Sequence, residues 1–196
     1  MTTHYFDSKQ TSKLNLDKIK IRVFEDVFEL FTASGIFSRE KLDNASKLLI
    51  ENANLENANS ILDLGCGLGV IGISLKRKYP NLQIDFSDVN ERAVMITRKN
   101  LELHNIKANS YISDGFEKIT NSYDTILLNP PYAAGRDVCY KLISDSHKYI
   151  NEGGSLQIVA RHQKGGKMLQ KKIEEVFKNS EVLAKGGGFR VYMGRK

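Results

Sequence analysis

Apolar residues recur along this chain with two different periods, and these periods predict its secondary structure. From residue 60 onward, short apolar runs of strand character alternate with longer segments of helical spacing. The predicted strands are Ile61–Leu64, Gln83–Ser87, Ser110–Ile112, Tyr123–Leu128, Leu156–Ala160, Val182–Leu183 and Phe189–Met193. The predicted helices are Val70–Lys78, Glu91–His104, Val138–Ile150 and Gly166–Asn179.

Strands that alternate with helices predict an α/β fold with a doubly wound, mostly parallel sheet of seven strands. The last two strands are joined only by Lys185-Gly-Gly-Gly188, which is too short for a helical crossover, so the sheet should end in a C-terminal antiparallel hairpin. Upstream, Lys20–Phe24 and Phe28–Thr32 predict a separate hairpin, and the segment from Leu42 predicts a helix. We therefore expect one domain over residues 1–196, with an N-terminal extension at 1–55 and a core at 56–196.

A glycine-rich turn joins the first core strand to the first core helix: Asp63-Leu-Gly65-Cys66-Gly67-Leu-Gly69. Glycine tolerates positive φ, and the following helix presents free N–H groups, so this turn predicts a ligand-binding loop. The segment Gly67-Leu-Gly69-Val-Ile-Gly72 also matches the dinucleotide pattern G-x-G-x-x-G. However, Asp63 would repel a pyrophosphate and suits an ammonium group. The loop resembles the [D/E]-x-G-x-G-x-G loop of class I S-adenosylmethionine (SAM) methyltransferases, but by itself leaves SAM and NAD both open.

Polar residues follow the predicted strands at the edge where such folds bind ligands. Asp88 could accept hydrogen bonds from ribose hydroxyls, or it could cap the helix that follows. Asp114 resembles the adenine-contacting acid of the methyltransferases, although an Asp-Gly turn explains it equally well. The residues expected to bind cofactor are Asp63, Gly65, Cys66, Gly67, Gly69, Asp88, Val89, Asp114, Gly115 and Asn129.

The tetrapeptide Asn129-Pro130-Pro131-Tyr132 follows a buried strand and favours SAM over NAD. The Asn129 side-chain carbonyl and the Pro130 backbone carbonyl can accept the two N–H groups of a planar amino nitrogen. This turns the nitrogen lone pair toward a methyl donor, while Tyr132 can stack on the substrate plane. The four residues, the expected catalytic group, resemble the [N/D]-P-P-[Y/F] signature of methyltransferases that act on planar amino nitrogens.

Further segments resemble the bacterial small-subunit rRNA guanine-N2 methyltransferases and their stand-alone archaeal-type relatives. They are Gly35-Ile-Phe-Ser-Arg39, Gly153–Ala160 and Gly188-Phe-Arg-Val-Tyr192, and the resemblance runs from about residue 20 to the end. The bacterial two-domain enzymes also carry a degenerate N-terminal copy of the fold, which this sequence lacks. The resemblance implies SAM as cofactor and, as partner, small-subunit rRNA or the assembled subunit. It also places Arg39 near the substrate and Phe37 near the cofactor or target base, although Phe37 could equally be a core aromatic residue. A protein-glutamine methyltransferase and a SAM-binding protein without activity remain alternatives.

Positive charge is concentrated in the last part of the chain. Residues 161–196 contain ten Lys and Arg against three Glu, whereas residues 1–160 contain nineteen against twenty Asp and Glu. This basic segment indicates either a soluble helix with a lysine face or a surface for an anionic partner such as RNA. Arg136, Arg161, His162 and Lys164 are the candidate phosphate contacts.

Other classes of protein are disfavoured by composition. No apolar run approaches the roughly 20 residues that cross a bilayer. Two separated cysteines, Cys66 and Cys139, predict no disulfide framework, and four scattered histidines predict no metal site. We expect a cytoplasmic protein, and its oligomeric state cannot be read from the sequence.

Overall fold

The computed structural model describes residues 15–33, 42–130 and 135–196. Its strands are β1 (Leu16–Val23), β2 (Asp26–Ala33), β3 (Ser60–Leu64), β4 (Gln83–Asp88), β5 (Ser110–Ile112), β6 (Tyr123–Leu128), β7 (Ile150–Arg161), β8 (Glu181–Gly186) and β9 (Phe189–Arg195). Its α-helices are α1 (Asn44–Asn52), α2 (Val70–Lys78), α3 (Glu91–Leu103), α4 (Arg136–Ser146) and α5 (Lys167–Phe177). A 3₁₀ turn, His147–Tyr149, follows α4, and a π-type turn, His162–Gly166, precedes α5.

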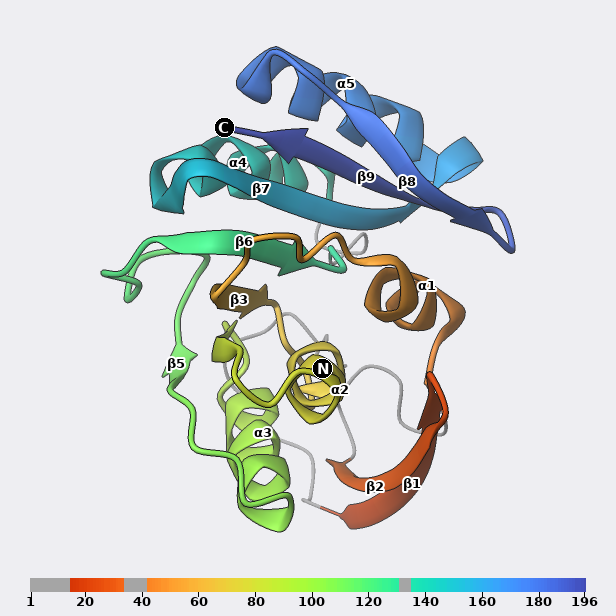
Figure 1. Ribbon diagram of the computed structural model, residues 1–196, viewed down its shortest axis with the longest axis vertical. Coiled ribbons are helices and arrows are strands. Elements are labelled where there is room, and N and C mark those ends of the chain that lie inside the picture. Colours follow the sequence, from red (N-terminus) through yellow and green to blue (C-terminus); the bar gives the residue numbers. More distant parts are fainter. Residues whose placement is uncertain (1–14, 34–41, 131–134) are drawn as a thin grey trace, which may run out of the picture.

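The large sheet has seven strands in the order β5-β4-β3-β6-β7-β9-β8, and β1 pairs with β2 in a separate hairpin (Figure 1). Strands β3 to β7 run parallel, and β9 is antiparallel to both of its neighbours, β7 and β8. The predicted doubly wound sheet with a C-terminal antiparallel hairpin is confirmed. Because β9 lies between β7 and β8, the chain enters the sheet edge at β8 before it returns next to β7.

Two apolar clusters cover the two faces of the large sheet. One contains Ile61, Leu127 and Val159 of the sheet together with side chains of α1, α2, α3 and the β1–β2 hairpin. The other contains Ile126 and Ile158 together with side chains of α4 and α5. Neighbouring strand residues point to opposite faces, so the continuous apolar run Ile126-Leu127-Leu128 on β6 supplies both clusters.

The N-terminal hairpin and helix form as predicted. Asp43 precedes α1 and its Oδ1 accepts the backbone N–H groups of Ala45 and Ser46 at 3.0 and 2.9 Å, so it caps the helix. The side-chain amide of Asn100, on α3, binds both the N–H and the C=O of Phe31 on β2. These bonds fasten the hairpin to the helices beside the large sheet.

Two predicted boundaries were wrong in the region from α4 to β7. The helix predicted from Val138 begins at Arg136, so Arg136 lies on α4 rather than in a loop. The strand predicted from Leu156 begins at Ile150 and contains Gly153 and Gly154. A Cβ at Gly154 would lie 2.5 Å from the Asp124 carbonyl oxygen, so glycine permits a close approach of β7 to β6.

Asp124 ties three strands together at the edge opposite their carboxyl ends. Its Oδ2 accepts the N–H groups of Asn59 and Ser60, both at 2.9 Å, and its Oδ1 accepts Asn151 Nδ2 at 2.8 Å. Burial raises the pKa of Asp124, but these hydrogen bonds more than offset that effect and leave the pKa below its usual value. A lowered native pKa stabilises the fold above the unfolded pKa, and this stabilisation is lost as pH falls through the native pKa.

We expect Asp124→Ala to lower the free energy of unfolding by about 2 kcal/mol at pH 7, because two backbone N–H groups lose their acceptor. The difference between variant and wild type should shrink as pH falls below 4. Chemical denaturation from pH 3 to 7 measures both effects. Glu117→Ala, at an exposed position, is the control and should change stability little. An equal effect of both substitutions would contradict this role for Asp124.

Candidate functional site

The predicted polar residues meet at one edge of the sheet because β3 to β7 run parallel. Asp63 lies near the end of β3, and Asp88 and Arg161 are the last residues of β4 and β7. Asp114 follows β5, and Asn129 follows β6. Figure 1 shows β3 and β6 ending on the side of the molecule where α1 and the β8–β9 turn lie. This edge is where ligands bind in open α/β sheets.

The glycine loop between β3 and α2 adopts the conformation that its sequence predicts. Gly65, Gly67 and Gly69 have φ values of 69°, 61° and 83°, which residues with a Cβ rarely adopt. The N–H groups of Gly65 and Cys66 donate to the Ser87 carbonyl at 2.7 and 3.0 Å. The loop is thus fixed to the end of β4 by backbone hydrogen bonds.

Helix α3 supplies two loop-holding side chains that sequence reasoning missed. Thr97 Oγ1 donates to the Gly67 carbonyl at 2.9 Å, and Asn100 Nδ2 donates to the Leu68 carbonyl at 2.9 Å. Both residues are fully buried. The available signal was their polarity on a helix face that otherwise carries Ala93, Val94 and Ile96.

Asp88 has both carboxylate oxygens engaged with backbone. Oδ2 accepts the Gly67 N–H and Oδ1 accepts the Asn90 N–H, each at 2.9 Å. The cap of α3 is Asn90, whose side chain accepts the N–H groups of Arg92 and Ala93, so Asp88 is not the helix cap. Asp88 therefore orients the glycine loop from the end of β4. Val89, between Asp88 and Asn90 in the chain, is half-buried.

Asp63 is fully buried and only one of its oxygens has a partner among the described residues. Oδ2 accepts the Gly72 N–H at 2.9 Å, one of the free donors at the start of α2, whereas Oδ1 has no hydrogen-bond partner. Burial, and to a lesser extent the charge of Asp88, raises the pKa of Asp63 to about 7 despite the Gly72 hydrogen bond. A buried acceptor without a donor fits a cationic ligand group such as an ammonium.

We expect Asp63→Asn to weaken SAM binding by at least 10-fold at pH 8, because the amide cannot neutralise an ammonium group. In wild type, affinity should rise as pH increases through about 7 and Asp63 ionises, whereas the variant should lose this dependence. Because the native pKa of Asp63 is raised, the free energy of unfolding of ligand-free wild type should fall as pH rises from the unfolded pKa of this carboxyl to about 7. The free energy of unfolding of the variant should fall less over the same pH range. Calorimetric titration and denaturation at several pH values measure these effects. Equal SAM affinity of variant and wild type would contradict the assignment.

Cys66 and the acidic turn after β5 complete the cofactor residues predicted from sequence. Burial, then the charges of Asp88 and Asp63, raises the pKa of the Cys66 thiol, which lies 3.6 Å from Thr97 Oγ1. Cys66 is therefore a packed neutral thiol rather than a nucleophile. Asp114 is exposed, and Gly115 has a φ of 53° beside Leu142. This is the Asp-Gly turn that the sequence allowed, and the exposed carboxylate remains available to a ligand.

Asn129 is held by a residue of the N-terminal extension. Its Nδ2 donates to Ser46 Oγ on α1 at 3.0 Å, and Ser46 is buried. This hydrogen bond uses the amide nitrogen of Asn129, so its side-chain carbonyl oxygen can accept from another donor. Pro130 is buried next to it. Pro131, Tyr132, Phe37 and Arg39, also predicted as site residues, lie outside the described residues.

The predicted phosphate contacts fall into two groups. Arg136 is exposed at the start of α4, with its guanidinium 3.8 Å from Asp137 and 5.7 Å from the centre of the Tyr140 ring. Arg161, His162 and Lys164 lie together at the end of β7 and in the turn that follows. The structure thus brings the last three together beside the β8–β9 hairpin and leaves Arg136 on α4.

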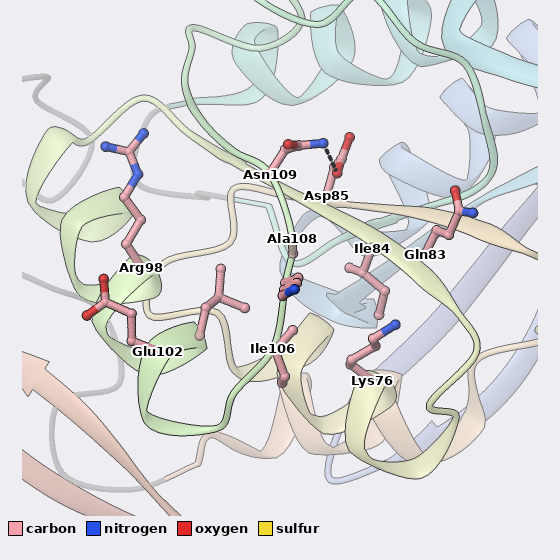
Figure 2. A pocket seen from close by; sticks show the side chains of 11 residues that line it. Lys76, Gln83, Ile84, Asp85, Arg98, Glu102, Ile106, Ala108 and Asn109 are labelled. Atoms are coloured by element: carbon pink, nitrogen blue, oxygen red, sulfur yellow. Dashed lines mark hydrogen bonds between the residues drawn. The ribbon is translucent and has the colours of Figure 1, made fainter.

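A cavity of about 650 Å³ lies elsewhere, at the amino ends of β4 and β5 (Figure 2). Several of its polar side chains already bind protein: Asp85 accepts Asn109 Nδ2 at 3.0 Å, and Arg98 donates to Ser110. Because the cavity lies at the opposite ends of the strands from the glycine loop, we do not assign the ligand site there. Within residues 15–33, 42–130 and 135–196, no cluster of metal-ligating side chains occurs, and no helix is long and apolar enough to span a membrane.

Comparison with known proteins places this arrangement in a family. Residues 27–193 match the methyltransferase small domain family. This chain belongs to that family. The prediction of a methyltransferase from the glycine loop and the Asn-Pro-Pro-Tyr motif is therefore confirmed at the level of the family.

The relatives of this chain differ in how much of their own length aligns with it. An uncharacterized protein of Bacillus subtilis, YbxB, is 33% identical over the whole of both chains. Ribosomal RNA small subunit methyltransferase C of Haemophilus influenzae is 35% identical over 83% of this chain and 50% of its own. A solved 16S rRNA N2 methyltransferase of T. thermophilus, in complex with AdoMet and guanosine, has a TM-score of 0.81 at 24% identity and covers 96% of this chain and 52% of its own. The chain thus spans about half the length of the rRNA methyltransferases that it matches.

Proposed function

We propose that this protein is a SAM-dependent N-methyltransferase that modifies an exocyclic amino group of a nucleobase in RNA, namely guanine N2 of small-subunit rRNA. The observation that carries the proposal is the hydrogen bond from Asn129 Nδ2 to Ser46, which leaves the Asn129 carbonyl oxygen free at the ligand-binding edge of the sheet. Similarity to rRNA methyltransferases over 83% of the chain supports the choice of substrate. An rRNA substrate implies a cytoplasmic site of action.

The residues at this edge fit SAM. Asp63 Oδ1, which has no partner among the described residues, would hold the ammonium group of its methionine part, and the positive-φ turn from Gly65 to Gly69 would let backbone approach the ligand closely. Asp88 would bind the ribose hydroxyls, and Asp114 with Gly115 would contact the adenine. When bound, SAM supplies an activated methyl group whose sulfonium leaves without help from a metal or a protein nucleophile.

The protein then contributes positioning rather than covalent chemistry. The Asn129 carbonyl oxygen and the Pro130 backbone carbonyl accept the two N–H groups of the guanine amino nitrogen, which directs its lone pair toward the methyl group. Tyr132, assigned by the motif, would stack on the base. Transfer would form a bond from the nitrogen to the methyl carbon as the carbon–sulfur bond breaks toward sulfur, and water would take the proton released from the methylated nitrogen. Guanine N2 is hidden in a paired or stacked base, so the target must first leave its stack.

Methyl transfer from labelled SAM tests this proposal. Small-subunit rRNA, assembled small subunits, tRNA and a release-factor protein with a target glutamine are offered in parallel, with Asn129→Ala as the matched control. We expect label in small-subunit rRNA or its subunit, recovered as N2-methylguanosine and absent with the variant. Label in the protein alone would replace this proposal with glutamine methylation. SAM binding without transfer to any substrate would identify a SAM-binding protein without this activity and overturn the proposal.

A further inference from the structure

Six basic side chains from five elements gather next to the candidate active site, and we call this group the hairpin surface. Its members are Arg161, His162, Lys164, Lys167, Lys185 and Arg190. His162 lies within the group, because its backbone N–H donates to the Gly188 carbonyl in the β8–β9 turn at 3.0 Å. Partial burial and the charges of Arg190, Lys167 and Lys185 lower the pKa of His162. Lys185 pairs with Arg190 across the β8–β9 hairpin, and Arg161 pairs with Phe189. The sequence indicated only Arg161, His162 and Lys164, because the others come from later elements.

The positive charges of the hairpin surface are not balanced by acidic side chains. Among the described residues, none of its five lysines and arginines takes part in an ion pair. Lys185 and Arg190 lie directly opposite each other on an antiparallel pair, an arrangement of like charges that destabilises a sheet. A bound anion would relieve the repulsion between Lys185 and Arg190. The needs of folding alone do not explain why two positive charges stand opposite each other.

The hairpin surface lies on the same edge of the sheet as Asn129. Strand β7 pairs with β6 so that Ile158 is opposite Leu128, and Arg161 lies three residues further toward the carboxyl end. Helix α1 links the two places: its Ser46 holds Asn129, and a Cβ at Gly186 of β8 would lie 3.1 Å from its Leu48. Figure 1 shows the β8–β9 turn extending beyond α1 on this side. A polymer with one of its units bound at Asn129 can therefore extend along this edge onto the hairpin surface.

An aromatic ring accompanies the positive charges. The Arg161 guanidinium lies 4.7 Å from the centre of the Phe189 ring, and Phe189 is half-buried at the start of β9. A planar cation stacked on an aromatic ring next to further cations is typical of surfaces that bind single-stranded nucleic acid. An acidic protein segment would match the charge but would make no use of this ring.

We propose that the hairpin surface binds the phosphate backbone of the RNA strand that flanks the target nucleotide. This inference rests on the proposed function and adds the face of the protein along which the substrate RNA runs. Lys185 and Arg190 contact phosphates. Partial burial and the neighbouring positive charges lower the pKa of His162 and so favour its neutral form, which contacts RNA as a hydrogen-bonding group. His162 Nδ1 is already 2.8 Å from the Tyr192 hydroxyl, which leaves Nε2 for that contact.

Two charge reversals test the hairpin surface. K185E/R190E reverses both hairpin charges, and the control K107E/K118E makes the same change of charge at two exposed lysines near β5, at the other end of the strand order. The probe is a small-subunit rRNA fragment that wild type methylates, or a single-stranded RNA oligonucleotide if none is found. We expect K185E/R190E to bind it at least 10-fold more weakly at 0.1 M salt. The slope of log K against log salt should fall by about 0.7 for each lost phosphate contact. SAM affinity should equal that of wild type in both variants.

The outcomes separate this inference from the proposed function. Wild-type-like RNA affinity and salt slope in K185E/R190E, or an equal loss in K107E/K118E, would overturn the inference even if rRNA is methylated. RNA binding that depends on Lys185 and Arg190 without any methyl transfer would support the surface and contradict the proposed function. Tighter wild-type binding to polyglutamate than to RNA would assign the surface to an acidic protein instead. K185Q/R190Q, which should give an intermediate loss, covers the case in which the double reversal does not fold.

Discussion

Replacement of Asn129 by alanine is expected to reduce kcat for methyl transfer by about 10²- to 10³-fold while SAM affinity stays within a few-fold of wild type. The carbonyl oxygen of Asn129 is the group that fixes the amino nitrogen of the substrate in the proposed mechanism, and water cannot replace its fixed direction. Single-turnover transfer to rRNA and calorimetric titration with SAM measure the two quantities. A loss of SAM affinity equal to the loss of rate would show that Asn129 serves the cofactor instead.

The partner of Asn129 allows a sharper form of this test. Ser46 acts through Asn129 by accepting its Nδ2–H, so Ser46→Ala should lower kcat about 10-fold with little change in the KM for RNA. Ser46→Thr keeps the hydroxyl and should restore most of the rate. In the Asn129→Ala background, Ser46→Ala should have no further effect on kcat. The same 10-fold loss in both backgrounds would mean that Ser46 affects the rate only through general stability.

The architecture was readable from sequence because the parallel core strands are short segments rich in apolar residues with a polar residue at or next to their carboxyl ends. Asp63, Asp88 and Asn129 mark such ends, and parallel strands bring such ends to one edge. The order of the last strands was not readable, because local pattern does not record which strand pairs with which. The start of β7 was misread because Gly153 and Gly154 resemble a turn, although the chain there continues as a strand with close contact to β6.

The residues that hold the site were less visible than those that would touch the ligand. Thr97 and Asn100 bind carbonyl groups of the glycine loop from a helix that begins about twenty residues after it. Ser46 reaches Asn129 across 83 positions of sequence. Serine, threonine and asparagine are frequent on helices, so only the tertiary structure distinguishes these three from solvent-facing residues. The sequence motifs therefore predicted ligand contacts, and the structure shows which residues hold them in place.

Gly72→Ala is expected to lower the free energy of unfolding by about 3 kcal/mol, although alanine favours helix. A Cβ at Gly72 would lie 2.3 and 2.6 Å from two ring carbons of Phe86, which is fully buried on β4. Helix α2 would have to move away from the sheet, and the Gly72 N–H would leave Asp63 Oδ2, so SAM affinity should also fall. Thermal denaturation and SAM titration measure the two losses. A variant as stable as wild type would show that Gly72 does not determine the distance between α2 and β4.

A second substitution should rescue the first if the cause is contact with the ring. Phe86→Leu removes the ring, so Gly72→Ala should cost much less in that background than in wild type. Equal costs would assign the loss to something other than Phe86.

The close approach of Gly72 to Phe86 also explains why Gly67-Leu-Gly69-Val-Ile-Gly72 matches the dinucleotide pattern without specifying NAD. In that pattern the third glycine serves close packing of helix on strand, as Gly72 does here, so this glycine reports the distance between α2 and β4 and carries no information about the cofactor. The choice of ligand rests on Asp63 and Asn129.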